Sequence, residues 1–143
     1  MTALAEGSIG RALDLAAAGG VELYRAVLAL LARERGIDPA ALHAFADRLV
    51  RPEAEEAYRV VEGLVGQMLA RLAIAATQGE AEAGALPDEG GLLLRRLGSR
   101  APAARWAALR GEIEESFART DALNLDRKQT ILGAFFAIER AAG

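Results

Sequence analysis

A single histidine and the carboxylate that follows it have a spacing that suits chemistry. His43 and Asp47 stand at positions i and i+4, which places two side chains on the same face of a helix. An imidazole beside a carboxylate can hold a proton or contribute to a metal site. A metal site normally needs about three or four ligands, and the chain has one His and no Cys. We therefore interpret His43 as an ordinary surface or boundary residue and expect no metal and no cofactor.

Two acidic clusters raise the question of acid–base catalysis. They occupy positions 53–56 and 112–115, and paired carboxylates act as general acid and base where their surroundings separate their pKa values. No surrounding residues are arranged to do this, and the sequence lacks the Gly-rich, Lys-containing motif of a phosphate-binding loop. We interpret both clusters as solvated helix surface, and we expect no catalytic residue and no enzyme activity in this stretch of chain.

The second half of the chain contains a locally basic region, formed by Arg95, Arg96, Arg100, Arg105 and Arg110. Such a region can meet phosphates or an acidic partner. The chain has a net charge of −3, so we interpret the region as a solvated face. Nucleic-acid binding through Arg95–Arg110 is the alternative, and it predicts an affinity that falls steeply with salt. A small-molecule-binding bundle or an unrecognised enzyme, with convergent polar groups in a cavity, is a further alternative.

The composition favours helices that pack closely. Alanine fills roughly a quarter of the positions, a helix-favouring choice, and only 5% of the residues are aromatic. Strands are usually enriched in aromatic and β-branched residues. The sequence therefore predicts an all-α helical bundle of about six to seven helices. We place the helices at about 8–18, 21–35, 39–50, 53–78, 90–98, 102–120 and from the Asn124–Gln129 segment to 141.

Several residues mark where these helices begin. Asp38 before Pro39 predicts an N-cap followed by proline at the first helical position. Asp126 and Gln129 have capping-box spacing for the last helix, and Asn124 is the alternative N-cap.

Apolar periodicity predicts which faces are buried. Trp106 begins one continuous stripe with Leu109, Ile113 and Phe117, which favours a core position over a platform for stacking bases. The helix at 53–78 has apolar residues on several sides, Ile74 among them, so we expect it at the centre. Gly63 and Gly66 in this helix predict close contacts with other helices. Residues 79–91 lack an apolar period and are rich in Gly, Glu, Ala, Pro and Asp, so we predict a flexible linker there.

We also expect a soluble, cytoplasmic chain that does not enter a membrane. Charged residues interrupt the apolar stretches before they reach the length of about 18 residues that a membrane span needs. The chain does not open with the basic and apolar regions of a secretory signal.

Both ends of the sequence are similar to one family. The opening Leu4-Ala5-Glu6-Gly7-Ser8-Ile9-Gly10-Arg11-Ala12-Leu13 resembles the lid-domain stretch of clamp-loader AAA+ subunits, in which Gly-Ser and Ala-Leu frame a sensor arginine. The sensor position is occupied by Gly10, and Arg11 comes one step later. The segment Asp121–Gln129 resembles the closing segment of the delta-prime subunits of bacterial DNA polymerase III, especially their alphaproteobacterial form. Gly19–Tyr24, after the first helix, fits the same family.

This resemblance implies a domain organisation and a role. Residues 1–19 would be the tail of the AAA+ lid domain, and residues 20–143 a helical collar domain that serves oligomerisation. In this family the collars of the delta-prime, gamma/tau and delta subunits form a ring that holds the AAA+ modules, which load the sliding clamp onto primed DNA. Gly10 at the sensor position fits a rigid, non-catalytic scaffold subunit of the polymerase holoenzyme.

The resemblance also implies partners and an interface. We expect contacts with the gamma/tau and delta subunits, indirect action on the sliding clamp and primed DNA, and no small-molecule ligand. The helices at 53–78 and 102–141 are the expected contact elements. The candidate interface residues are Trp106, Arg110, Asn124, Arg127 and Lys128.

Overall fold

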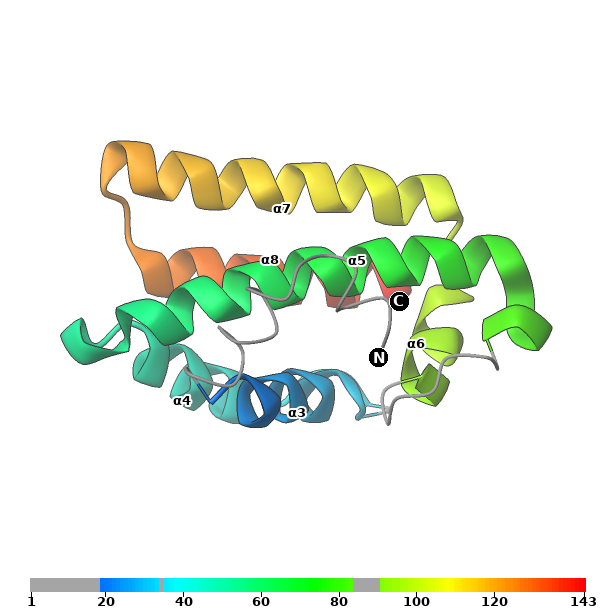
Figure 1. Ribbon diagram of the computed structural model, residues 1–143, viewed down its shortest axis with the longest axis horizontal. Coiled ribbons are helices and arrows are strands. Elements are labelled where there is room, and N and C mark those ends of the chain that lie inside the picture. The colour runs from blue at the N-terminus through cyan, green and yellow to red at the C-terminus, as the bar shows by residue number, and fades with distance from the viewer. Residues whose placement is uncertain (1–18, 34, 84–90) are drawn as a thin grey trace.

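The computed structural model describes residues 19–33, 35–83 and 91–143, and these form an all-α helical bundle (Figure 1). The elements, labelled as in Figure 1, are α3 (Gly20–Leu31), α4 (Pro39–Leu49), the short 3₁₀ turn η1 (Pro52–Ala54), α5 (Glu55–Ala83), α6 (Gly91–Gly98), α7 (Ala103–Leu123) and α8 (Arg127–Ala142). No strand occurs in these ranges, so the predicted fold class is confirmed. The predicted helix at 8–18 and nearly all of the predicted lid tail lie outside the described residues.

Helix α5 is the longest described helix and lies at the centre of the bundle. It packs against α7 on one side, against α3 on the other, and against α6 near its C-terminal half. Helix α7 runs antiparallel to α5, and α8 returns behind α5 and contacts both α7 and α4 (Figure 1). Helix α8 therefore begins at the end of the bundle where α7 ends, and it ends near α6 and the α3–α4 connection.

The predicted apolar stripes form the core. Trp106, Leu109, Ile113 and Phe117 are all buried along α7, and the predicted inner face of α4 is buried as well. The expectation for Ile74 is wrong, because its side chain is 52% exposed. Ile74 lies on the side of α5 that none of the described helices covers.

The stretch Pro52–Thr77 is long and apolar enough to cross a membrane by length and composition. Glu62 and Arg71 interrupt this stretch, as expected, but its average composition is still apolar enough. Nearly half of its most apolar window is nevertheless buried inside the bundle, because α3, α6 and α7 pack around it. Such packing is that of a central core helix.

The predicted N-caps are confirmed. Asp38 accepts a hydrogen bond from the N–H of Ala40 at 3.1 Å, and Asp126 accepts from the N–H of Lys128 at 2.9 Å. Asn124 is not an N-cap, which corrects the alternative. It has a left-handed backbone with φ 53° and ends α7, a conformation that asparagine tolerates better than most residues.

Two helix boundaries differ from those predicted. Helix α3 ends at Leu31 rather than at 35, because the chain must turn there to bury Ile37. Helix α5 continues to Ala83, so the predicted linker is wrong for 79–83. Glutamate and alanine dominate that segment and favour a helix even without an apolar face. Residues 84–90 of the predicted linker lie outside the described residues.

One close helix contact involves Gly98, a glycine that the sequence analysis did not single out. A Cβ at Gly63 would meet nothing within 4 Å, and one at Gly66 would be in ordinary contact with Glu114. The prediction of close contacts at these positions is therefore wrong. At Gly98, a Cβ would lie 3.0 Å from the carbonyl oxygen of Leu72. The approach of α6 to α5 depends on this glycine.

Candidate interface at the turn between α7 and α8

The predicted interface residues fall into two places. Asn124, Arg127 and Lys128 lie together at the turn between α7 and α8. Arg110 and Trp106 lie in the N-terminal half of α7, about 20 Å and about 27 Å from Asn124 at the helical rise of about 1.5 Å per residue. The structure therefore does not bring all the predicted residues into one site.

Trp106 is a core residue, which corrects its place in the predicted interface. Its side chain is 0% exposed, and its indole Nε1–H donates to the carbonyl oxygen of Gly98 at 3.0 Å. This bond satisfies the polar group of a buried indole. Trp106 fixes the α6–α7 connection and has no surface to offer a partner.

The turn itself presents apolar side chains to solvent. The left-handed backbone of Asn124 reverses the chain, and the N–H of Leu125 donates to the carbonyl oxygen of Thr120 at 2.9 Å. Leu123 and Leu125, on either side of Asn124, are 63% and 47% exposed. These are large apolar groups on a tip whose backbone is held by the helix end and by the Asp126 cap.

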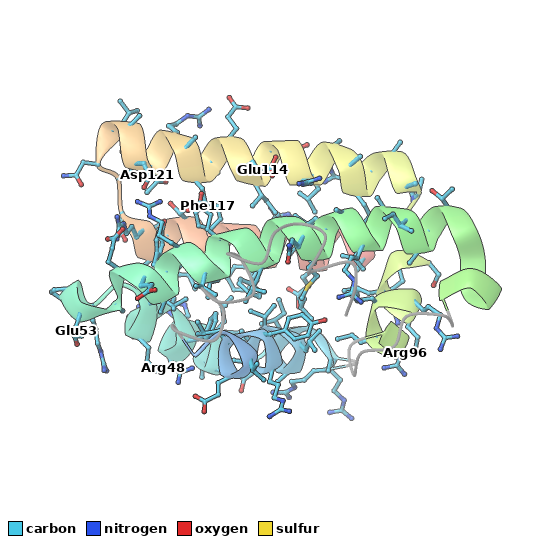
Figure 2. All side chains as sticks on the ribbon, in the orientation of Figure 1. Arg48, Glu53, Arg96, Glu114, Phe117 and Asp121 are labelled. Carbon is cyan, nitrogen blue, oxygen red and sulfur yellow. The ribbon has the colours of Figure 1, made fainter. Side chains whose placement is uncertain are left out.

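An arginine from the central helix ties α5 to the end of α7. The Nη1 and Nη2 atoms of Arg59 bind the two carboxylate oxygens of Asp121 at 2.7 and 3.0 Å. Arg59 also contacts Glu55 and Glu62 on its own helix, each at 3.0 Å. Figure 2 shows Asp121 near the end of α7, close to Phe117. A forked pair of this kind is stronger and more directional than a single ion pair.

A second arginine links α8 to the same cluster. The Nη1 of Arg127 donates to Glu55 at 2.5 Å, so Glu55 is shared by Arg59 and Arg127. The Arg127 guanidinium lies 4.4 Å from the centre of the Tyr58 ring, a favourable cation–π distance. Tyr58 is fully buried beneath it and packs against Phe117.

The remaining predicted residue, Lys128, joins α8 to α4. Its Nζ lies 2.8 Å from Asp47. The sequence places Asp47 one helical turn from His43, but in the structure Asp47 pairs with a lysine from another helix. Charged side chains thus join four helices, α4, α5, α7 and α8, at this end of the bundle.

The pKa values of these groups follow from the ion pairs. Arg59 holds the pKa of Asp121 below its ordinary value, Arg127 and then Arg59 do the same for Glu55, and Lys128 does so for Asp47. Burial raises the pKa of Tyr58 to about 12. All these groups keep one charge state at neutral pH, which suits binding and structural support rather than proton transfer.

The surface between these side chains forms a shallow hollow of about 350 Å³. Arg59, Asp121, Asn124, Leu125 and Arg127 line it, together with Val50 and Thr120. We call the surface formed by these residues and Leu123 the turn surface. It combines exposed leucines with charged groups in fixed positions, which is the anatomy of a protein–protein contact.

Of the eight residues of the turn surface, only Asn124 and Arg127 are among the candidate interface residues predicted from the sequence, and the other six were missed. Glu55, beside this surface, was interpreted as solvated helix surface, and Arg59 and Asp121 were not among the candidates. The spacing of Arg59 from Glu55 and Glu62 was a usable signal, because i, i+4 and i, i+3 pairs meet on a helix. Asp121 lies 62 positions from Arg59, so only the packing of α7 on α5 brings the two together.

The basic region is divided by the fold. Arg105 pairs with Glu112 at 3.4 Å, and Arg110 pairs with Glu114 at 3.2 Å, so both belong to the charged outer face of α7. Arg96 and Arg100 instead line a cleft between α6, α8 and the α3–α4 connection. Arg95–Arg110 does not form one continuous basic surface.

Comparison of the chain with protein families, with curated proteins and with solved structures finds no match. Across the described residues, no group of His, Asp and Glu side chains is arranged to hold a metal ion. The case for a function therefore depends on the resemblance at the two chain ends and on the turn surface.

Proposed function

We propose that this chain is the helical assembly module of a clamp-loader subunit, of the collar type found in the delta-prime subunits of bacterial DNA polymerase III. In this role residues 20–143 act as a non-catalytic scaffold in the cytoplasm. They would join the collars of gamma/tau and delta subunits into a ring above the machinery that loads the sliding clamp onto primed DNA.

The turn surface is the observation that supports this proposal most directly. Exposed leucines surrounded by fixed charges suit an interface whose centre is apolar and whose rim is polar. The segment that carries the family resemblance, Asp121–Gln129, is also the segment that builds this surface. One of the segments that resemble the family therefore supplies five of the eight residues of the turn surface: Asp121, Leu123, Asn124, Leu125 and Arg127.

The chemistry of the turn surface also suits a scaffold. Its carboxylates and guanidiniums bind one another across α5, α7 and α8, which holds the leucines of the turn in place. A contact surface whose side chains are already ordered loses less conformational entropy on association. Rigid collars would transmit position between neighbouring AAA+ modules.

The test is complex formation with the gamma/tau collar of the same organism, measured by size-exclusion chromatography with light scattering at low and high salt. We expect a stable complex at both salts. The double variant Leu123→Ser/Leu125→Ser should weaken it at least about tenfold, because residues at the centre of an interface are the minority whose truncation costs about 1 kcal/mol or more each.

Ile74→Ser provides the matched control, because Ile74 is an equally exposed apolar residue on a different face. This variant should bind as the parent does. The proposal fails if the parent chain forms no complex, or if Ile74→Ser weakens the complex as much as the turn variant. Salt-sensitive binding of the chain to primed DNA, without any complex, would support the nucleic-acid alternative instead.

A further inference from the structure

A separate cleft lies at the other end of α8 from the turn surface. Its walls come from the α3–α4 connection, from α6 and from the last residues of α8, and its volume is about 580 Å³. Pockets that hold small ligands or peptide side chains are commonly about 300–1,000 Å³. Arg96, labelled in Figure 2, marks the α6 wall. We call this feature the arginine cleft.

The floor of the arginine cleft is apolar. Leu31, Ile37 and Ile138 line it and belong to the buried core, and Leu93 and Leu97 are partly buried beside them. Water in such a place is weakly held by the protein, so an apolar group that displaces it gains affinity.

The rim of the arginine cleft is positively charged. Arg33, Arg35, Arg96 and Arg100 line it, together with the carboxylate of Glu139 and the C-terminal residue Gly143. Arg33 pairs with Asp38 at 3.2 Å. Among the residues that the structure describes, no ion pair is formed by Arg35, Arg96 or Arg100. These three guanidiniums are an excess of positive charge on a chain whose net charge is −3.

Glu139 offsets only one of these charges, and its carboxylate also has a structural task. Its Oε2 accepts a hydrogen bond from the N–H of Ile37 at 2.5 Å. Gly36 makes room for this contact, since a Cβ there would lie 2.5 Å from the same oxygen, and its φ of +96° favours glycine. The bond fixes the α3–α4 connection to α8, and it sets the shape of one wall.

The opposite wall is fixed as well. Gly98 packs tightly on α5, and its carbonyl oxygen accepts the Trp106 bond. Arg96 and Arg100 stand on either side of this anchored point. The guanidiniums therefore project from a rigid frame, which lowers the entropy cost of binding a ligand.

We propose that the arginine cleft binds an acidic peptide segment of a partner protein. Carboxylates of the segment would pair with Arg35, Arg96 and Arg100, and an apolar side chain between them would cover the floor. Guanidinium groups bind carboxylates through paired, charge-assisted hydrogen bonds. This proposal does not depend on the clamp-loader assignment.

A peptide fits this site better than a nucleic acid does. A phosphate backbone supplies no apolar group for the floor, and none of the described residues that line the cleft is an aromatic residue that could stack on a base. The neighbouring Arg105 and Arg110, which would extend a basic track, are already paired with glutamates.

The test uses fluorescence anisotropy with the full chain and three rhodamine-labelled probes. The first is the peptide Glu-Asp-Leu-Leu-Asp-Glu, the second replaces both leucines with serine, and the third is single-stranded oligothymidine. The cleft variant is Arg96→Glu/Arg100→Glu. The control, Arg105→Glu/Arg119→Glu, changes the net charge equally but alters exposed residues of α7 that do not line the cleft.

We expect the leucine peptide to bind best. The cleft variant should weaken that binding at least about tenfold, because hydrogen bonds between charged groups are lost, and the control should change it less than about twofold. Circular dichroism confirms that both variants fold. The proposal is overturned if the peptide does not bind, if the serine peptide binds as tightly, or if both variants weaken binding equally. Tighter binding of oligothymidine, lost in the cleft variant, would assign the cleft to nucleic acid instead.

Discussion

Gly98 shows how one missing side chain can set the distance between two helices. The backbone of α5 lies so close to it that a Cβ would stand 3.0 Å from the carbonyl oxygen of Leu72 and 3.1 Å from the Cβ of Ala75. Neither atom is at the end of a flexible side chain. Gly63, in contrast, is exposed in the middle of α5 and has open space around its Cβ position.

These two glycines should respond oppositely to the same substitution. Gly98→Ala should lower the free energy of unfolding by about 1–3 kcal/mol, because extra volume in a tight contact forces the helices apart. Gly63→Ala should raise it by up to about 1 kcal/mol, because alanine is the better helix former. Urea denaturation followed by circular dichroism measures both. Equal effects of the two substitutions would contradict the close contact at Gly98.

The positions of the helices were largely predictable from the sequence, but the packing of the helices against one another was not. The stripe from Trp106 to Phe117 and the cap at Asp38 depend on local spacing, and both are present in the structure. The partners of Arg59 and the walls of the arginine cleft depend on which helix ends meet. Arg33 and Arg96 are far apart in the chain and line one cleft, because the α3–α4 connection and α6 meet beside the end of α8. Periodicity identifies the inner face of each helix, and it contains no information about which outer faces become neighbours.

The start of α8 depends on one carboxylate. Asp126 accepts hydrogen bonds from the N–H groups of Lys128 and Gln129, and it stands directly after the turn that carries Leu125. Asp126→Ala should lower the free energy of unfolding by about 0.5–2 kcal/mol. Asp126→Asn should lower it much less, since asparagine caps a helix nearly as well as aspartate. Chemical denaturation of the two variants gives the comparison. If Asp126→Asn lowered the free energy of unfolding as much as Asp126→Ala, the charge of the carboxylate would contribute more to stability than its capping hydrogen bonds.

At the scale of the whole molecule, charged pairs join helices that are distant in sequence. The Arg59–Asp121 pair links α5 to α7, Arg127–Glu55 links α8 to α5, and Lys128–Asp47 links α8 to α4. Single exposed ion pairs contribute little to stability. Here Glu55 and the two arginines share contacts, so the loss of one partner affects several helices at once.

This arrangement predicts a dependence of stability on acid. The pKa values of Asp121, Glu55 and Asp47 are lowered in the folded chain by their cationic partners. A carboxyl with a lowered folded-state pKa stabilises the protein fully above its unfolded-state pKa, about 4. The contribution disappears as pH falls through the folded-state value. The urea midpoint should therefore hold steady as pH falls towards about 5 and decline below about 4.

The variant Arg59→Met tests whether the shared network causes this decline. Methionine keeps an apolar stem over Tyr58. It removes the guanidinium that lowers the pKa of Asp121 and helps to lower the pKa of Glu55. Its stability should be lower than that of the parent at neutral pH, and its decline between about pH 4 and pH 2 should be shallower. Arg119→Met is the control, because Arg119 pairs with the exposed Glu115 on its own helix. The stability of this variant should decline with acid as steeply as that of the parent. Parallel acid curves for the parent and Arg59→Met would mean that the decline arises elsewhere, and that the ion pairs at the turn surface hold the helices together no more strongly at neutral pH than in acid.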